Sequence, residues 1–144
     1  MSDKNKESQN FINLGIVLND LGEVLIIKRA KEETGAGVTL TYAFPGGKQH
    51  LDESRAECVA REILAETGYE VCSRREISLR KHPQFDVFLV YHECELIEDK
   101  PTNKPSEPHE VAEVLWQPVS KLKELFTTDL DPSVEIYLGI ETSK

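Results

Sequence analysis

The residues of this chain that could do chemistry are carboxylates set at regular spacing. Residues 47–69 read GKQHLDESRAECVAREILAETGY, in which Glu53 is followed by Arg61, Glu62 and Glu66. Glu62 and Glu66 are four positions apart, so on a helix their side chains lie one turn apart on the same face. Like charges at this spacing destabilise a helix unless a cation lies between them. The run therefore predicts a site that holds a hard divalent cation against a diphosphate.

Two neighbouring features support this interpretation over an ordinary solvated acidic face. The turn PGG at residues 45–47 supplies a sterically free backbone just before the helix, where carbonyls and amides can approach a ligand closely. Glu53, Glu57 and Arg61 form a second row along the same segment, in which Arg61 can pair with an acid and fix its rotamer. The turn, the acidic pair and the arginine thus agree on a binding site.

The elements that must position these residues are strands interleaved with helices. Strands are expected over residues 11–19, 23–29, 39–44, 69–79, 84–96 and 111–116, and helices over 54–67, 119–126 and 132–140. The first two strands flank the turn signal NDLG at residues 19–22, which predicts a hairpin. The polar composition of 69–79 is typical of an edge strand. Such an order predicts an α/β fold class with helices on a mixed sheet.

The helix that carries the acids has clear start and stop signals. Asp52 or Ser54 can cap its first turn, and Gly68 follows its last residue. Apolar residues recur at helical spacing and define its expected buried face: Ala56, Val59, Ala60, Ile63 and Leu64. The spacing therefore predicts where the helix begins and ends, and which side of it faces the core.

Composition limits the remaining possibilities. The chain has 144 residues, which fits a single domain over residues 11–144 after a disordered tail at 1–10. A net charge of −9 disfavours duplex nucleic acid as a partner, and no apolar run approaches the roughly 20 residues that span a bilayer. Three cysteines without CxxC spacing, and an N-terminus without an apolar h-region, indicate a cytoplasmic protein.

Residues 47–69 resemble the Nudix box, whose pattern is G-x5-E-x7-R-E-U-x-E-E-x-G-U with U a bulky apolar residue. The positions that match are Gly47, Glu53, Arg61, Glu62, Ile63, Glu66, Gly68 and Tyr69. The lead-in FPG at 44–46 is also similar to that family, and a looser resemblance covers most of the chain. The chain thus looks like a MutT-like Nudix hydrolase, which implies a Nudix-type α/β/α sandwich with a central mixed β-sheet.

The resemblance implies hydrolysis of a nucleoside diphosphate linked to another group X, giving a nucleoside monophosphate and phospho-X. It implies Mg²⁺ as cofactor, with Mn²⁺ as substitute, held by Glu62, Glu66, the Gly46 carbonyl and Glu110. The implied catalytic residues are Glu53, Arg61, Glu62, Glu66 and Glu110. The implied substrate-binding residues are Arg29, Phe44, Gly46 and Gly47, although Phe44 also suits the core. Glu66, Glu53 and Glu110 all remain candidates for the general base.

Ala65 departs from the pattern, because it stands where the box has the first glutamate of its pair. Alanine cannot bind a cation, but Mg²⁺ often needs only one or two protein carboxylates, with waters and substrate phosphates as further ligands. We therefore expect weaker cation binding rather than an inactive site. The alternative is a non-catalytic nucleotide-sensing module on the same fold. The substrate, whether nucleoside triphosphate or nucleotide sugar, and the choice between monomer and homodimer stay open.

Overall fold

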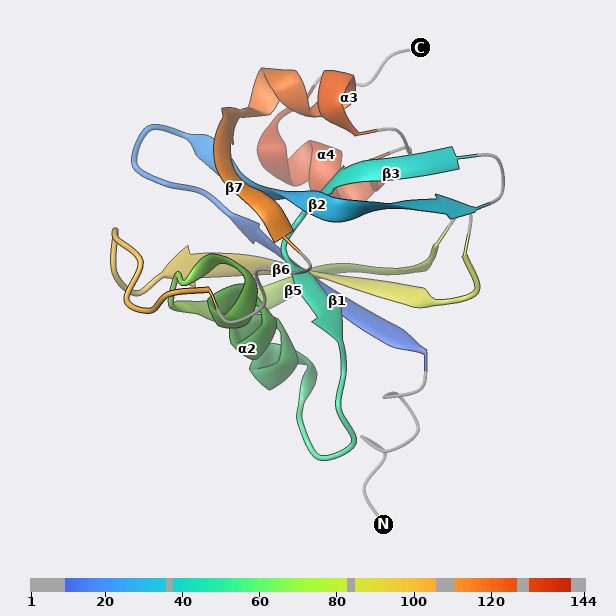
Figure 1. Cartoon of the computed structure of the whole chain (residues 1–144), viewed down its shortest axis with the longest axis horizontal. Coiled ribbons are helices and arrows are strands. Elements are labelled where there is room, and N and C mark those ends of the chain that lie inside the picture. The colour runs from blue at the N-terminus through green and yellow to red at the C-terminus, as the bar shows by residue number, and fades with distance from the viewer. Residues whose placement is uncertain (1–9, 36–37, 83–84, 106–110, 127–129, 141–144) are drawn as a thin grey trace.

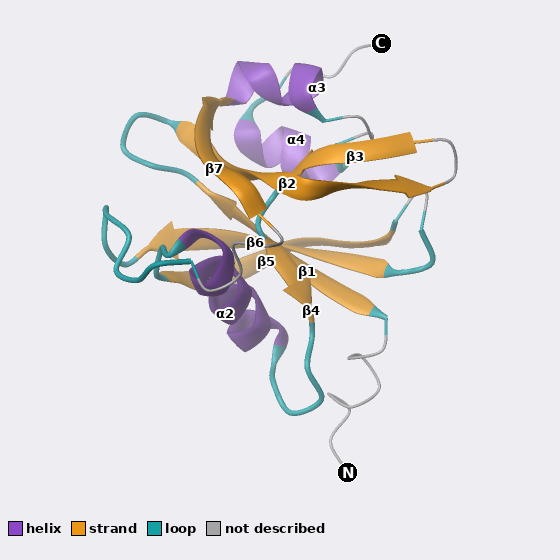
Figure 2. Ribbon diagram, viewed as in Figure 1, coloured by secondary structure: helices purple, strands orange, loops and turns teal. Residues whose placement is uncertain are grey.

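The computed structural model of the chain describes residues 10–35, 38–82, 85–105, 111–126 and 130–140. Its strands are β1 (Phe11–Val17), β2 (Glu23–Gly35), β3 (Val38–Ala43), β4 (Gly46–Lys48), β5 (Val71–Lys81), β6 (Phe88–Leu96) and β7 (Val111–Pro118). Its helices are α2 (Arg55–Thr67), the 3-10 turn η1 (Val119–Lys121), α3 (Leu122–Leu125) and α4 (Pro132–Leu138) (Figures 1 and 2). In this part of the chain no helix is both long and apolar enough to cross a bilayer.

The strands form a four-stranded sheet in the order β4-β1-β6-β5 and a three-stranded sheet in the order β3-β2-β7. Strand β1 runs parallel to β6 and antiparallel to β4, so the larger sheet is mixed, as predicted. Strand β5 lies at the edge of this sheet, which agrees with the polar sequence of the expected edge strand. The parallel pairing joins the first strand to one that follows it by about half the chain's length.

The predicted hairpin of the first two strands is wrong in its pairing, although its turn forms. Asn19 accepts hydrogen bonds from the backbone N–H groups of Leu21 and Glu23, at 3.0 and 2.9 Å, and so closes the turn. The strands on either side then enter different sheets and meet through the isolated bridge Leu18↔Val24. The physical reason is that β4 and β6 occupy both edges of β1, which leaves no edge for β2.

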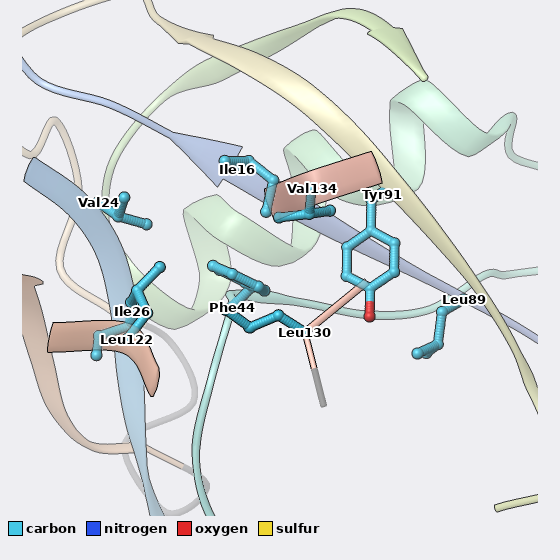
Figure 3. Close-up of a cluster of buried hydrophobic side chains, with 9 residues drawn as sticks. All are labelled: Ile16, Val24, Ile26, Phe44, Leu89, Tyr91, Leu122, Leu130 and Val134. Carbon is cyan, nitrogen blue, oxygen red and sulfur yellow. The ribbon is translucent and has the colours of Figure 1, made fainter. Parts of the chain in front are cut away.

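The two sheets together form the middle layer, with one buried cluster on each face. Neighbouring residues of a strand point to opposite faces, so a strand can contribute to both clusters. Ile16 of β1 and Ile26 of β2 belong to one buried cluster, and Val17 and Leu25 belong to the other. Figure 3 shows the first cluster, which is Ile16, Val24, Ile26, Phe44, Leu89, Tyr91, Leu122, Leu130 and Val134. The second includes Val59 and Ile63 of α2. Helix α2 covers one face and α3 and α4 the other, so the predicted α/β/α sandwich is confirmed (Figure 1).

Helix α2 has both of its predicted ends. Ser54 accepts from the N–H of Glu57 at 3.1 Å while Glu57 accepts from the N–H of Ser54 at 2.7 Å, which completes a capping box. Gly68 ends the helix in the left-handed region, at φ 80°, and donates its N–H to Leu64 O. Because both ends are fixed by local bonds, the helical register of the acids is fixed too.

The buried face of α2 differs from the predicted one. Ala56 is exposed, and the buried residues are Cys58, Val59, Ile63, Glu66 and Thr67. The helix lies over Gly15 of β1, where a Cβ would clash with the Ile63 side chain. Glu66 is buried and its carboxylate contacts Gly46 of β4, so it faces the sheet rather than solvent.

Strand β4 was not predicted, and β2 continues through residues expected to form a loop. The sequence of β4 is GGK, and glycine has a low intrinsic preference for strands, so its pairing with β1 determines its conformation. The helix expected at 119–126 is instead a 3-10 turn followed by the single turn of α3. Strand β4 matters for function because it brings the glycine turn beside α2.

Candidate active site

Glu53 is buried in the loop between β4 and α2, where it accepts three hydrogen bonds. Arg61 donates Nε–H to Oε2 at 2.9 Å and Nη2–H to Oε1 at 2.8 Å. The backbone N–H of His50 donates to Oε1 at 2.8 Å. These bonds, those from Arg61 above all, lower the pKa of Glu53 from 4.5 to about 2, although burial acts in the opposite direction. Glu53 is therefore a fixed anion at neutral pH.

Arg61 joins the loop, the helix and strand β4. Besides its two bonds to Glu53, it donates Nη1–H to Glu62 Oε2 at 3.3 Å and Nη2–H to the carbonyl of Lys48 at 3.2 Å. The hydrogen bonds to Glu53 and the charge of Glu62 raise the pKa of Arg61 above its usual range. Of the two acids in its row, Arg61 thus pairs with Glu53, and the planar guanidinium fixes that carboxylate by two-point contact.

Gly47 allows the carboxylate of Glu62 to lie against β4. A Cβ at this position would be 2.5 Å from both Cδ and Oε2 of Glu62, well inside van der Waals contact. The side chain of Glu62 is only 12% exposed, so the carboxylate is held close to the strand rather than extended into solvent. Any side chain at Gly47 would have to displace it.

Gly46 makes the corresponding contact with Glu66. Its backbone N–H donates to Glu66 Oε1 at 2.9 Å, and its φ of 152° lies where glycine is favoured. A Cβ here would clash with the carbonyl oxygen of Asn13 and lie 2.7 Å from Leu14 Cα, so close backbone packing also requires glycine. Both helix carboxylates, from Glu62 and Glu66, therefore reach the two glycines of β4.

Cys58 lies beneath the same turn and is a neutral thiol. Its Sγ–H donates to the carbonyl of Gly47 at 3.4 Å. Burial, together with the negative charge of Glu53, raises the pKa of this thiol to about 12. Since the thiolate is the reactive form of cysteine, Cys58 has a structural rather than a nucleophilic role here.

The donor set fits a hard cation that is shared with a phosphate substrate. Within the described residues, no three histidine, cysteine, aspartate or glutamate side chains are grouped so as to hold a metal ion. A structural zinc site, which takes four protein ligands, is therefore not supported by these residues. Mg²⁺ takes one or two carboxylates and completes its octahedron with water and phosphate oxygens. Glu62 and Glu66, which lie against the glycines of β4, match this requirement of Mg²⁺ for one or two carboxylates.

Comparison with known proteins agrees with this geometry. A family model described as "NUDIX domain" matches residues 12–136. The chain belongs to the Nudix family. A Bacillus subtilis (strain 168) protein provisionally named 8-oxo-dGTP diphosphatase is 37% identical over 70 residues, which are 49% of this chain and 42% of that protein. The match thus spans less than half the length of this curated relative.

Solved structures show the same fold at low sequence identity. A Nudix hydrolase from Nitrosomonas europaea is 14% identical, with a TM-score of 0.71, over 90% of this chain and 88% of the other. An ADP-ribose pyrophosphatase from Streptococcus suis is 16% identical, with a TM-score of 0.60, over 91% and 89% of the two chains. The family model thus shows the Nudix family, and the solved structures show that the fold is shared.

The structure also describes two other predicted site residues, Phe44 and Arg29. Phe44 is buried in the core, where its ring centroid lies 4.8 Å from that of Phe126 and 6.3 Å from that of Tyr91. This burial favours the core role that the sequence also allowed. Arg29 is half-buried on β2, opposite Val111 of β7, on the other sheet from Gly46 and Gly47. Glu110 lies outside the described residues, as do residues 1–9 of the predicted tail.

Three buried polar residues, one inside the Nudix box and two on strands β1 and β6, were not expected to have a role: Gln49, Asn13 and His92. Asn13 interrupts the apolar strand FINLGIV, and His92 interrupts FLVYHEC. A polar side chain in the middle of a buried strand costs free energy unless it is hydrogen-bonded, so it is a signal that the sequence does contain.

Proposed function

We propose that this chain is a Nudix hydrolase that depends on Mg²⁺, or Mn²⁺ in its place, and cleaves the pyrophosphate linkage of a nucleoside diphosphate derivative. The observation that carries the proposal is the paired contact of α2 with β4, in which Glu66 accepts from Gly46 N–H and Glu62 lies against Gly47. It joins two carboxylates to a backbone that can approach a diphosphate. When bound, the cation neutralises phosphate oxygens and lowers the pKa of a coordinated water.

The chain's own residues then have separate roles. Water forms a new bond to phosphorus, the bridging P–O bond breaks with its electron pair leaving on the departing phosphate, and one proton of the water passes to a base. Glu53 is poorly suited to receive that proton, because its pKa is about 2 and Arg61 occupies both of its oxygens. We assign Glu53 and Arg61 to positioning and Glu62 and Glu66 to the cation, with Glu66 and Glu110 as the candidates for the base.

The proposed substrate class is a nucleoside diphosphate linked to a group X, as the family resemblance implies. The Bacillus subtilis relative is named for 8-oxo-dGTP and the Streptococcus suis structure for ADP-ribose. A nucleoside triphosphate and a nucleotide sugar share the diphosphate and nucleoside that the proposed site would recognise. We therefore propose this shared group as the substrate class, with X left to a direct screen.

The test is turnover of dGTP, 8-oxo-dGTP, ADP-ribose and UDP-glucose with Mg²⁺, and again with EDTA. We expect cation-dependent hydrolysis of at least one compound, and ¹⁸O from labelled water will show which phosphorus is attacked. Glu62→Gln should lower kcat by about 100- to 1,000-fold, the size of effect seen when one preorganised charge contact is removed. Glu70→Gln, a charge-matched change at an exposed residue just after α2, should leave turnover unchanged.

The gap at Ala65 favours one other function, a nucleotide-sensing module. That reading predicts tight binding of a nucleoside diphosphate compound with no turnover of any compound in the screen. The contacts among Glu53, Arg61 and Glu62 support the enzyme instead, because an ordered carboxylate network of this kind is not needed to bind a nucleotide. Calorimetric titration of the wild-type protein beside the turnover assay separates the two.

A further inference from the structure

A line of buried polar side chains crosses the four-stranded sheet and ends at the Glu53 loop. Ser73 Oγ of β5 lies 2.8 Å from His92 Nδ1 of β6, and His92 Nε2 lies 2.8 Å from Asn13 Oδ1 of β1. Asn13 Nδ2 donates to Gln49 Oε1 at 2.9 Å, and Gln49 Nε2 donates to the backbone carbonyl of Glu53 at 3.1 Å. The line therefore joins the far edge strand to the residue that holds Arg61.

All hydrogen bonds of the line point in one direction, which the backbone carbonyl of Glu53 at its end determines. The carbonyl of Glu53 can only accept, so Gln49 must present its NH₂ there and its oxygen to Asn13. Asn13 then presents its oxygen to His92, whose Nε2 must carry the proton. Burial lowers the pKa of His92 to about 4, so at neutral pH the ring is neutral and its Nδ1 accepts from the hydroxyl of Ser73. Each side chain has a single consistent orientation.

These residues cost more to bury than the core around them. Asn13, Gln49 and His92 are at most 2% exposed. Replacing hydrogen-bonded partners together by apolar groups of the same shape is often close to neutral for stability, so folding alone does not require this line. The line does, however, fix the position of the backbone carbonyl of Glu53, where it ends. Gln49 is itself fixed to β1, since its N–H donates to Phe11 O at 3.1 Å.

Glu53 is consequently held at both of its ends. Gln49 holds its main-chain carbonyl from inside the sheet, while Arg61 and the N–H of His50 hold its carboxylate. Arg61 in turn contacts Glu62, one of the two carboxylates at the glycine strand. A shift of the loop at residues 49–53 would be transmitted through two short contacts to Glu62.

We propose that Asn13, Gln49 and His92 are positioning residues for the candidate active site, which set the loop at 49–53 so that Glu53 fixes Arg61 and Arg61 fixes Glu62. The assignment rests on the proposed function. Outer-shell partners of this kind orient groups that touch the ligand, and their loss lowers activity about 10- to 100-fold.

The test compares Gln49→Met with a matched control. Methionine keeps the length of glutamine but can donate no hydrogen bond, so we expect kcat to fall about 10- to 100-fold while KM changes less than about threefold. The Arg61 Nε–H signal in ¹⁵N NMR should also exchange with solvent at least about tenfold faster, a 1.4 kcal/mol loss of protection. The control is Asn19→Ala, which removes the bonds to Leu21 and Glu23 at the turn before β2.

A second pair of variants keeps the test independent of the folding of Gln49→Met. His92→Gln retains a donor toward Asn13 and should keep kcat within about threefold of wild type, whereas His92→Leu should lose activity as Gln49→Met does. A purely structural role for the line would lower stability in both variants without separating their kcat values. Urea unfolding of each variant supplies that comparison.

The outcomes distinguish this inference from the proposed function. Absence of turnover by the wild-type protein overturns the hydrolase proposal, but the exchange rate of Arg61 Nε–H still tests the positioning line. Wild-type rates of both turnover and exchange in Gln49→Met and His92→Leu overturn the positioning proposal. So does an equal loss of kcat in Asn19→Ala at the same loss of stability.

Discussion

Glu53 and Glu66 are both buried carboxylates of the Nudix box, but their surroundings are opposite in character. Glu53 is matched by a guanidinium and a backbone N–H, which lower its pKa to about 2. Glu66 accepts from Gly46 N–H and lies one helical turn from a second acid, Glu62. An anion already paired with arginine is suited to hold other groups in place. An anion set beside another anion is suited to bind a cation, so we propose that Glu53, in the loop before α2, has a positioning role and that Glu66, on α2, binds the ligand.

The largest expected effect comes from neutralising the two carboxylates separately. Glu66→Gln should lower kcat about 100- to 1,000-fold because it removes charge that faces the ligand. Glu53→Gln should lower kcat by only about 10- to 100-fold, because it loosens Arg61 without touching the cation. Steady-state kinetics at saturating Mg²⁺ measure both. An equal loss of kcat in the two variants would contradict the proposal that Glu66 binds the cation and Glu53 only positions Arg61.

Alanine substitutions at the two glycines of β4 should have different effects, one on kcat and the other on stability. Gly47→Ala displaces the movable end of the Glu62 side chain and should lower kcat by about 100-fold, the cost of roughly 1 Å misplacement. Its unfolding free energy should change by less than about 1 kcal/mol. Gly46→Ala meets backbone atoms of Asn13 and Leu14 at a φ of 152°, and should destabilise the fold by about 3 kcal/mol or more.

Urea unfolding and kinetics of both alanine variants check this contrast. A stable but inactive Gly47→Ala protein would support the role of Glu62, and Gly15→Ala gives a reference for a clash with a core side chain. Comparable destabilisation at Gly46 and Gly47 would contradict the assignment of β4 to two different contacts.

The pairing of Glu53 with Arg61 also predicts that stability depends on pH. Because the pKa of Glu53 is lowered from 4.5 to about 2, its pairing stabilises the folded state fully above pH 4.5, and this stability is lost as the pH falls toward 2. The amount is on the order of 2–3 kcal/mol. Urea unfolding of wild type and Glu53→Gln should differ by that amount at pH 7 and converge near pH 2.

His92 makes a second contribution to the change of unfolding free energy with pH, and it is the same in wild type and Glu53→Gln. Its pKa is lowered from 6.5 to about 4, so the folded state loses stability as the pH falls from 6.5 to 4, and the slope cancels in the difference between wild type and Glu53→Gln. A difference between these proteins that stays constant from pH 7 to pH 2.5 would show that Arg61 does not stabilise the anion of Glu53.

The smallest expected effect is at the missing carboxylate. Ala65→Glu should lower the Mg²⁺ concentration for half-maximal activity by up to about tenfold, because added ligand charge strengthens cation binding. Ala56→Glu adds the same charge to the same helix at an exposed position, and should leave the Mg²⁺ dependence unchanged. An unaltered Mg²⁺ dependence in Ala65→Glu would mean that another group already fills this position.

The sequence predicted the parts of the molecule that local bonds determine. Helix α2 was placed with both ends because Ser54 and Gly68 cap it through neighbours in the chain. The pairing of Arg61 with Glu53 does not follow from helical spacing, because Glu53 lies in the loop before α2. The contacts of Gly46 with Asn13, and of Gly15 with Ile63, were not predictable, because they depend on which strands become neighbours. The same cause made the hairpin prediction wrong, since β6 occupies the edge expected for β2.

The parallel pairing of β1 with β6 has a consequence for how the protein is made. The register joins Phe11 to Phe88, and the hydrogen bond between Asn13 and His92 spans 79 positions. Contacts this distant in sequence form slowly, whereas a capped helix such as α2 can form early. During synthesis, α2 and its acids are complete while the partner strand of Asn13 is still absent. The sheet that places β1 and β4 beside α2 can therefore be completed only after β6 has been synthesised.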